Sequence, residues 1–148
     1  MLKGPLLHPE ILSALASAGH GSRILIADGN YPFATAAGPN ATVVFLNLAP
    51  GVVTVPQALD AILPSVPVEA AHIIQSPPGM NPPILEEFRS RLGDLPLEPL
   101  DRHAFYGAVR SPDTCLVVAT GERRIFACIL LTIGVVMPPR EPCPGSPF

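Results

Sequence analysis

Short apolar runs recur along this chain and predict strands that are covered on both faces of a sheet. The clearest is residues 23–28, which read RILIAD, and residues 42–47 repeat the pattern as TVVFLN. A sheet built from such strands needs helices on both sides to bury its faces. Further strands are expected at residues 68–75, 97–100, 115–119 and 125–136, with a polar turn at residues 120–124.

Between these runs, apolar side chains recur at the spacing of a helix face. Residues 9–18 place Ile11 and Leu15 on one face, and Pro9 suits the first position of that helix. Strands that alternate with helices predict the α/β class, as a single layered domain whose central, mostly parallel sheet is flanked by helices. The other helices are expected from Thr54 to Pro64, from Asn81 to Arg91 and from Arg102 to Val109.

Proline is abundant and unevenly spread. It accounts for 20 of the 148 residues, against about 5% in ordinary proteins. A hydrophobic content of 48% excludes disorder over most of the length, because disordered proline-rich chains are polar. Five prolines fall in residues 138–148, which show no periodicity. We therefore expect one domain at residues 1–137 and a proline-rich tail at residues 138–148.

Charged residues are scarce. They make up 14% of the chain, with a net charge of −3, so the sequence offers no basic surface for nucleic acid or for an anionic membrane. Low charge combined with high apolar content favours a surface that is buried in a homo-oligomer. Prolines interrupt the longest uncharged stretch, residues 29–59, which excludes one membrane-spanning helix there.

Neither export nor disulfide chemistry is indicated. The apolar region that an export signal needs is interrupted at residues 8–10, which read HPE. The cysteines are Cys115, Cys128 and Cys143, and they lack C-x-x-C spacing. We expect reduced thiols in a cytoplasmic protein.

Two polar residues flank the strand expected at residues 23–28. Asp28 stands at its carboxyl end, where ligands gather in α/β proteins, although an aspartate followed by glycine and asparagine is also good turn chemistry. His20 lies between two glycines before the same strand, where a histidine can serve simply as a helix-end residue. Spacing alone predicts a polar cluster at residues 20–30 and identifies no reaction.

The sequence lacks the motifs that hold nucleotides or metals. There is no G-x-G-x-x-G run and no phosphate-binding loop that ends in lysine. His8, His72 and His103 have no partner residues at metal-ligand spacing, so no metal site is expected. With only nine basic residues and no aromatic clusters, a nucleic-acid partner is not expected either.

Five segments, taken in their order and spacing, resemble the family of ribose pyranases and fucose mutarotases. They are Met1–Gly4, the run from Gly19 through Asp28 to Pro32, Leu59–Pro64, Arg102–Tyr106 and Val117–Glu122. The ordered set extends over nearly the whole chain, from Met1 to Val136. Arg102–Tyr106, which reads RHAFY, resembles the fucose branch more than the ribose branch.

This resemblance implies an α/β protein that assembles into rings, commonly decamers of two pentamers, with sites near subunit boundaries. It also implies an isomerase that interconverts the cyclic forms of free monosaccharides without cofactor or metal. On the matching positions, His20 is expected to be the catalytic residue. Asp28 and Arg102 are expected to bind the sugar.

The chemistry of mutarotation suits these residue types. Opening a sugar hemiacetal requires a proton for the ring oxygen and the removal of one from the anomeric hydroxyl. An imidazole, with an ordinary pKa of about 6.5, can do either near neutral pH. Asp28 can orient His20 or accept hydrogen bonds from sugar hydroxyls, and Arg102 can donate them.

One segment departs from the family pattern. After Thr-Gly-Glu, the family carries a tyrosine and an asparagine two residues apart, whose polar groups hold the sugar. This chain has Phe126 and Cys128 there, unless the site has shifted and both are ordinary strand residues. Each lost hydrogen bond is worth about 0.5–1.5 kcal/mol, so the departure weakens sugar binding and puts catalytic competence in question.

Three functions therefore remain to be compared. The leading hypothesis is a mutarotase for fucose or a similar sugar, with His20 as its acid–base residue. The substitutions at Phe126 and Cys128 favour a second one, a ring-forming sugar-binding or structural relative without efficient catalysis. A ribose pyranase is the third.

Overall fold

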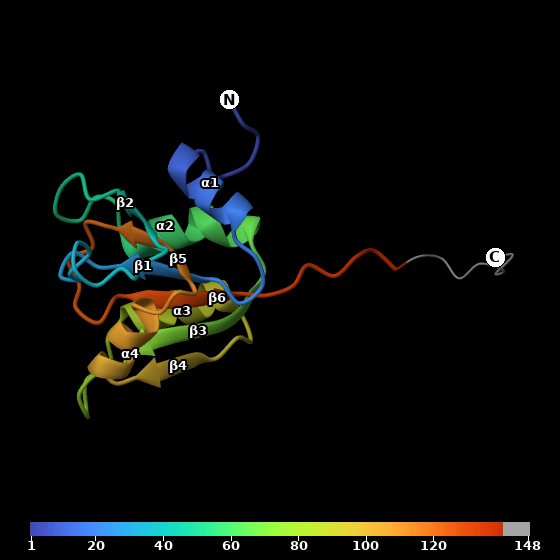
Figure 1. Ribbon diagram of the computed structural model, residues 1–148. Helices are drawn as coiled ribbons and strands as arrows, with labels where there is room; N and C mark the ends of the chain where they lie inside the picture. Colours follow the sequence, from blue (N-terminus) through green and yellow to red (C-terminus); the bar gives the residue numbers. More distant parts are fainter. Residues whose placement is uncertain (141–148) are drawn as a thin grey trace, which may run out of the picture.

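The expected alternation of strands and helices is confirmed in the computed structural model, which describes residues 1–140 (Figure 1). Its helices are α1 (Pro9–Ser17), α2 (Val55–Ile62), α3 (Ile84–Leu92) and α4 (Arg102–Val109), with a short 3-10 helix, η1 (Leu63–Ser65), after α2. Its strands are β1 (Arg23–Ala27), β2 (Thr42–Phe45), β3 (Val68–Ile74), β4 (Leu97–Leu100), β5 (Thr114–Ala119) and β6 (Ile129–Ile133). Thr54 begins α2 with a capping box that it shares with Gln57, and the Asp101 carboxylate caps α4 by accepting from the Ala104 N–H at 2.9 Å.

The six strands form one sheet in the order β2-β5-β1-β6-β3-β4. β6 runs antiparallel to both of its neighbours, β1 and β3, while the remaining neighbouring pairs are parallel. All strands except β6 therefore point the same way, which confirms the mostly parallel sheet. Their carboxyl ends, together with the start of β6, meet at one end of the sheet, which we call the carboxyl edge. The opposite end is the amino edge.

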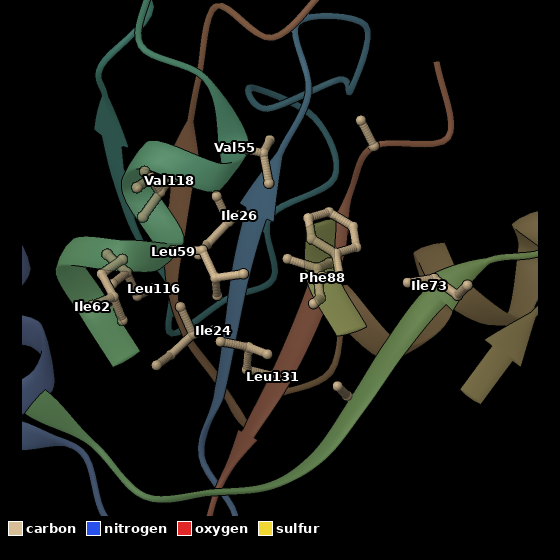
Figure 2. Close-up of a cluster of buried hydrophobic side chains, with 14 of the residues drawn as sticks. Ile24, Ile26, Val55, Leu59, Ile62, Ile73, Phe88, Leu116, Val118 and Leu131 are labelled. Atoms are coloured by element: carbon tan, nitrogen blue, oxygen red, sulfur yellow. The ribbon is translucent and has the colours of Figure 1, made fainter. Parts of the chain in front are cut away.

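Apolar side chains cover both faces of the sheet, as the continuous strand patterns predict. On β1, Ile24 and Ile26 face α2 and α3, where they belong to a cluster that includes Leu59 and Phe88 (Figure 2). On the opposite face of β1, Leu25 and Ala27 belong to a second cluster. This cluster includes Phe105 and Val109 of α4. The sheet is thus a buried layer between helices.

Several predicted boundaries are wrong: the strand expected at residues 125–136 starts late and ends early, at Ile133, the strand expected at residues 42–47 ends at Phe45, and the third helix starts late. The strand expected at residues 125–136 begins only at Ile129, because Phe126 has a φ of 55°, in the left-handed region, and the Ala127 N–H donates to the Asp28 carboxylate instead of to a strand. Residues 125–128 are therefore a loop. The third helix starts at Ile84 rather than Asn81, since Pro82 and Pro83 form a turn before it.

After β6 the chain leaves the sheet and leads away from it (Figure 1). Residues 134–140 form neither helix nor strand, and Val135, Val136 and Met137 are exposed. The remainder of the expected tail, with Cys143, lies outside the described residues. Among residues 1–140, no helix has the length and apolar character needed to cross a membrane.

Candidate functional site

A cavity of about 270 Å³ opens at the carboxyl edge of the sheet. Asp28 reaches it from the end of β1, Ile74 from the end of β3, and Arg102 and Tyr106 from α4. The carboxyl ends of parallel strands are the usual ligand sites of such sheets, because the loops that follow the strands converge there. The rest of the lining comes from Asn30, Tyr31, Ile125, Phe126 and Cys128.

Asp28 is the buried acid of this cavity. Its Oδ1 accepts a hydrogen bond from the Asn30 N–H at 3.0 Å, and its Oδ2 accepts one from the Ala127 N–H at 3.2 Å. Burial raises the pKa of the Asp28 carboxyl, and these two hydrogen bonds oppose that rise. The bond to Asn30 is the turn contact expected from the sequence. The bond to Ala127 is an additional one, which ties the end of β1 to the loop before β6.

Arg102 lines the same cavity as Asp28. It is the first residue of α4 and directly follows Asp101, which caps that helix. β4 ends at Leu100, at the carboxyl edge of the sheet, so α4 begins there. Arg102 is exposed, so its guanidinium is accessible to a ligand. The structure thus brings a hydrogen-bond acceptor and a donor to one cavity from positions 74 residues apart (102 − 28). That they contact a sugar stays a prediction.

Aromatic rings form much of the cavity wall. Tyr31 and Tyr106 meet edge to face with ring centroids 5.1 Å apart. The Tyr31 hydroxyl donates to the Ala36 carbonyl at 2.7 Å, and burial raises its pKa, so this phenol is structural. Tyr31 and Ile74 were not among the predicted site residues. Their positions in the sequence could have identified them, because Tyr31 follows the end of β1 and Ile74 is the last residue of β3.

The departure from the family pattern lies inside this cavity. Phe126 and Cys128 both line it, beside Asp28, so they are not residues of an ordinary strand elsewhere. Burial raises the pKa of the Cys128 thiol well above its ordinary value, which keeps the thiol neutral. A phenyl ring and a neutral thiol give this side of the cavity an apolar character.

His20 lies at the other end of the sheet. Its Nε2 is 3.0 Å from Oε2 and 3.1 Å from Oε1 of Glu69, and its side chain is 59% exposed. A separate hollow of about 310 Å³ adjoins it, with a largely apolar lining that includes Val135 and Val136. His20 therefore has an acidic partner at the amino edge, rather than only ending a helix.

Within one chain, His20 and Asp28 do not converge on one cavity. They flank β1, and the five residues of that strand separate them by about 16 Å at roughly 3.3 Å per residue. An extended strand cannot fold back on itself, so the expectation that Asp28 orients His20 is wrong for a single chain. Glu69, which the sequence interpretation did not select, makes that contact instead.

Comparisons with known proteins extend over nearly the whole chain. The model of the RbsD / FucU transport protein family matches residues 1–136. Fucose mutarotase of Danio rerio is 32% identical and is matched over 97% of this chain and 99% of its own length. D-ribose pyranase of Geobacillus kaustophilus is 30% identical, over 91% and 95%. A crystal structure of fucose mutarotase from Streptococcus pneumoniae with L-fucose superposes with a TM-score of 0.80 at 28% identity, over 93% of this chain and all of that one.

Asp28→Asn is expected to lower the free energy of unfolding by about 1–3 kcal/mol, because an amide offers one oxygen and one NH₂ to two N–H donors. One buried donor then loses its acceptor. Urea denaturation would measure the change. Asp113→Asn, at an exposed aspartate, is the matched control and should leave the stability within about 0.5 kcal/mol of the wild type. Equal stability of the two variants would contradict this account of Asp28.

The Asp28 carboxyl is also expected to titrate above 3.8, its ordinary pKa. Just above that pH the folded chain keeps a proton that the unfolded chain has released. Its contribution to stability is therefore fully present below pH 3.8 and is lost as the pH rises through the folded-state pKa. A carboxyl ¹³C titration by NMR would measure the midpoint, with Asp28→Asn identifying the resonance. A midpoint at or below 3.8 would refute the expected effect of burial.

Proposed function

Because the chain belongs to the RbsD / FucU transport protein family, we propose that it is a cofactor-independent mutarotase that interconverts the anomers of a free monosaccharide such as L-fucose. The single observation that carries this proposal is the cavity shared by Asp28 and Arg102. A carboxylate accepts hydrogen bonds from sugar hydroxyls and a guanidinium donates them, so the pair can orient a small polyol. The relatives named fucose mutarotase and D-ribose pyranase support a reaction on a free sugar.

Three polar groups of the cavity in one chain are already engaged or poorly suited to moving the protons of ring opening. The Tyr31 hydroxyl is already bonded to Ala36, and the Cys128 thiol is buried and neutral. Both Asp28 oxygens accept backbone hydrogen bonds. A positioned imidazole contributes roughly 10²–10⁴-fold to such proton transfers. His20 is the expected source, but it lies at the opposite edge of the sheet.

His20 of a second copy therefore completes the site in our proposal. The amino edge of one copy would dock on the carboxyl edge of the next, and repetition of such a head-to-tail contact gives a ring where the rotation between copies closes. Exposed apolar side chains at both edges support that contact: Ile125 at the cavity, and Val135 and Val136 beside His20. The low content of charged residues, 14%, supports it as well.

Glu69 gives His20 a defined role in this arrangement. Its carboxylate accepts from Nε2–H, which stabilises the tautomer with a free lone pair on Nδ1. Nδ1 then removes the proton of the anomeric hydroxyl, and the imidazolium can return a proton to the ring oxygen. The open chain rotates about its C1–C2 bond and closes on the other face. No cofactor takes part in these steps.

The apolar side of the cavity bears on the choice of sugar. Ile74, Ile125 and Phe126 present hydrocarbon where a hydroxymethyl group would need hydrogen bonds. A 6-deoxy sugar such as L-fucose places a methyl group there at no such cost. Phe126 and Cys128, which stand where the family carries tyrosine and asparagine, also favour a second candidate function. That candidate is a protein that binds a sugar and does not convert it.

Exchange NMR on L-fucose, L-galactose and D-ribose would test the activity. The wild type is expected to exchange the anomers of L-fucose faster than buffer, and faster than those of L-galactose, which carries the additional hydroxyl. His20→Ala should lose the roughly 10²–10⁴-fold gain of its acid–base group. His103→Ala, at an exposed histidine of α4, is the control and should behave as the wild type. Binding without exchange would favour the second candidate, and an active His20→Ala would refute the role of His20.

Mixing two inactive variants would test the shared site. Neither His20→Ala nor Asp28→Ala alone should be active. Co-expressed, they should regain about a quarter of the wild-type activity, because that share of sites pairs an intact His20 from one copy with an intact Asp28 from the next. His20→Ala co-expressed with the double variant contains no intact pair and should stay inactive. If the first mixture also stays inactive although the copies assemble together, the two residues do not act across a boundary.

A further inference from the structure

A network of charges lies under the loop that forms one wall of the cavity. This loop, residues 120–128, leads from β5 to β6. Within it, Glu122 is only 4% exposed. Its carboxylate accepts from Nε of Arg124 at 3.0 Å, from the second terminal nitrogen at 3.0 Å and from the Arg124 backbone N–H at 3.1 Å. The Arg124 guanidinium therefore binds the nearly buried Glu122 carboxylate in a bidentate manner.

The same guanidinium reaches out of the loop to helix α3. Its other terminal nitrogen donates to the Glu87 carboxylate. Glu87 lies in α3, and its backbone carbonyl accepts from Arg91 at 3.0 Å. Arg91 binds both oxygens of Asp60 in α2, at 2.6 and 3.0 Å. The loop is thus tied through Arg124 to two helices that pack on the core.

The loop is also joined to the strand end that carries Asp28. The Gly29 N–H donates to the Glu122 carbonyl at 2.9 Å, and the Thr120 hydroxyl donates to the Ala27 carbonyl at 2.7 Å. These bonds hold the residues on either side of Asp28. These two hydrogen bonds therefore couple the position of the Glu122 segment to that of the Asp28 segment.

Directly after Arg124, the loop enters the cavity wall. Phe126 has its φ of 55°, which a non-glycine side chain rarely adopts and which flanking contacts must hold. On one side that contact is the Ala127 N–H bonded to Asp28, and on the other it is the Arg124 network. Burial alone would raise the pKa of Glu122, but its hydrogen bonds from Arg124 outweigh burial and lower it, so both partners are charged.

We propose that Arg124 is a positioning residue of the sugar site. By gripping Glu122 and Glu87, it holds the segment that presents Phe126 to the cavity and the Ala127 N–H to the Asp28 carboxylate. The role in sugar binding rests on the proposed function. Removing Arg124 leaves a buried carboxylate without its cation, and such a group relaxes by moving towards water. The loop then shifts, and the cavity wall shifts with it.

The adjacent arginine provides a matched control. Arg123 is exposed and takes part in none of the ion pairs formed among residues 1–140. Arg123→Gln and Arg124→Gln change the same residue type by the same chemistry, one position apart. Arg124→Lys is the conservative variant, since it keeps the charge and loses the planar grip.

Anomer-exchange kinetics and residue-resolved amide hydrogen exchange would test the proposal. Arg124→Gln is expected to raise KM for the sugar about tenfold, with a smaller effect on kcat, because about one site hydrogen bond is lost. The Ala127 amide should exchange at least tenfold faster than in the wild type. Arg124→Lys should recover part of both effects, and Arg123→Gln should match the wild type.

A purely structural role has a different signature. If Arg124→Gln lowers Tm but leaves KM and the protection of the Ala127 amide as in the wild type, the proposal is overturned. Should that variant not fold, Glu87→Gln removes one arm of the network and is expected to give smaller shifts in the same direction. If the wild type exchanges no sugar, the proposed function fails, and the Ala127 amide decides the positioning role by itself: unchanged protection overturns it, and faster exchange supports it.

Discussion

The hydrogen bond between the Ala127 N–H and the Asp28 carboxylate is the contact on which the architecture of the cavity depends. It takes a backbone donor that a longer β6 would have paired within the sheet, so the strand begins later and a loop forms. It also accompanies the left-handed backbone of Phe126, which turns that segment into a wall of the cavity. One buried carboxylate therefore closes the end of β1, shortens β6 and shapes the site.

The direction of the strands imposes the second constraint. Because all strands except β6 run the same way, residues that follow strands and residues that precede them lie at opposite edges. Asp28 and Arg102 belong to the first group, and His20 to the second. A rigid sheet cannot bring the two groups together, so a reaction that uses both needs two copies of the chain. Oligomerisation is then part of the proposed chemistry and not only a source of stability.

The network around Arg124 illustrates how charges in a chain with few of them are used. Glu122, Arg124 and Glu87 are linked by direct contacts between charged groups, and Arg91 joins the backbone of Glu87 to the Asp60 carboxylate. An isolated surface pair would contribute little. A nearly buried carboxylate with a fitted guanidinium has a large penalty for separation, and that penalty is what gives the loop a fixed position.

The sequence by itself determined the class of fold, nearly all strands and helices, and the location of Asp28 at a strand end, because apolar spacing and capping residues act over a few positions. It did not determine where β6 begins, because a carboxylate 99 residues away captures the Ala127 N–H. The family resemblance, but not local spacing, anticipated that Arg102 and Asp28 share one site, and the tertiary structure places both at one cavity. Only the tertiary structure decided that His20 lies away from that cavity and pairs with Glu69. The physical reason is the order of the strands in the sheet, which sets the distances between residues far apart in the chain and leaves no mark on local spacing.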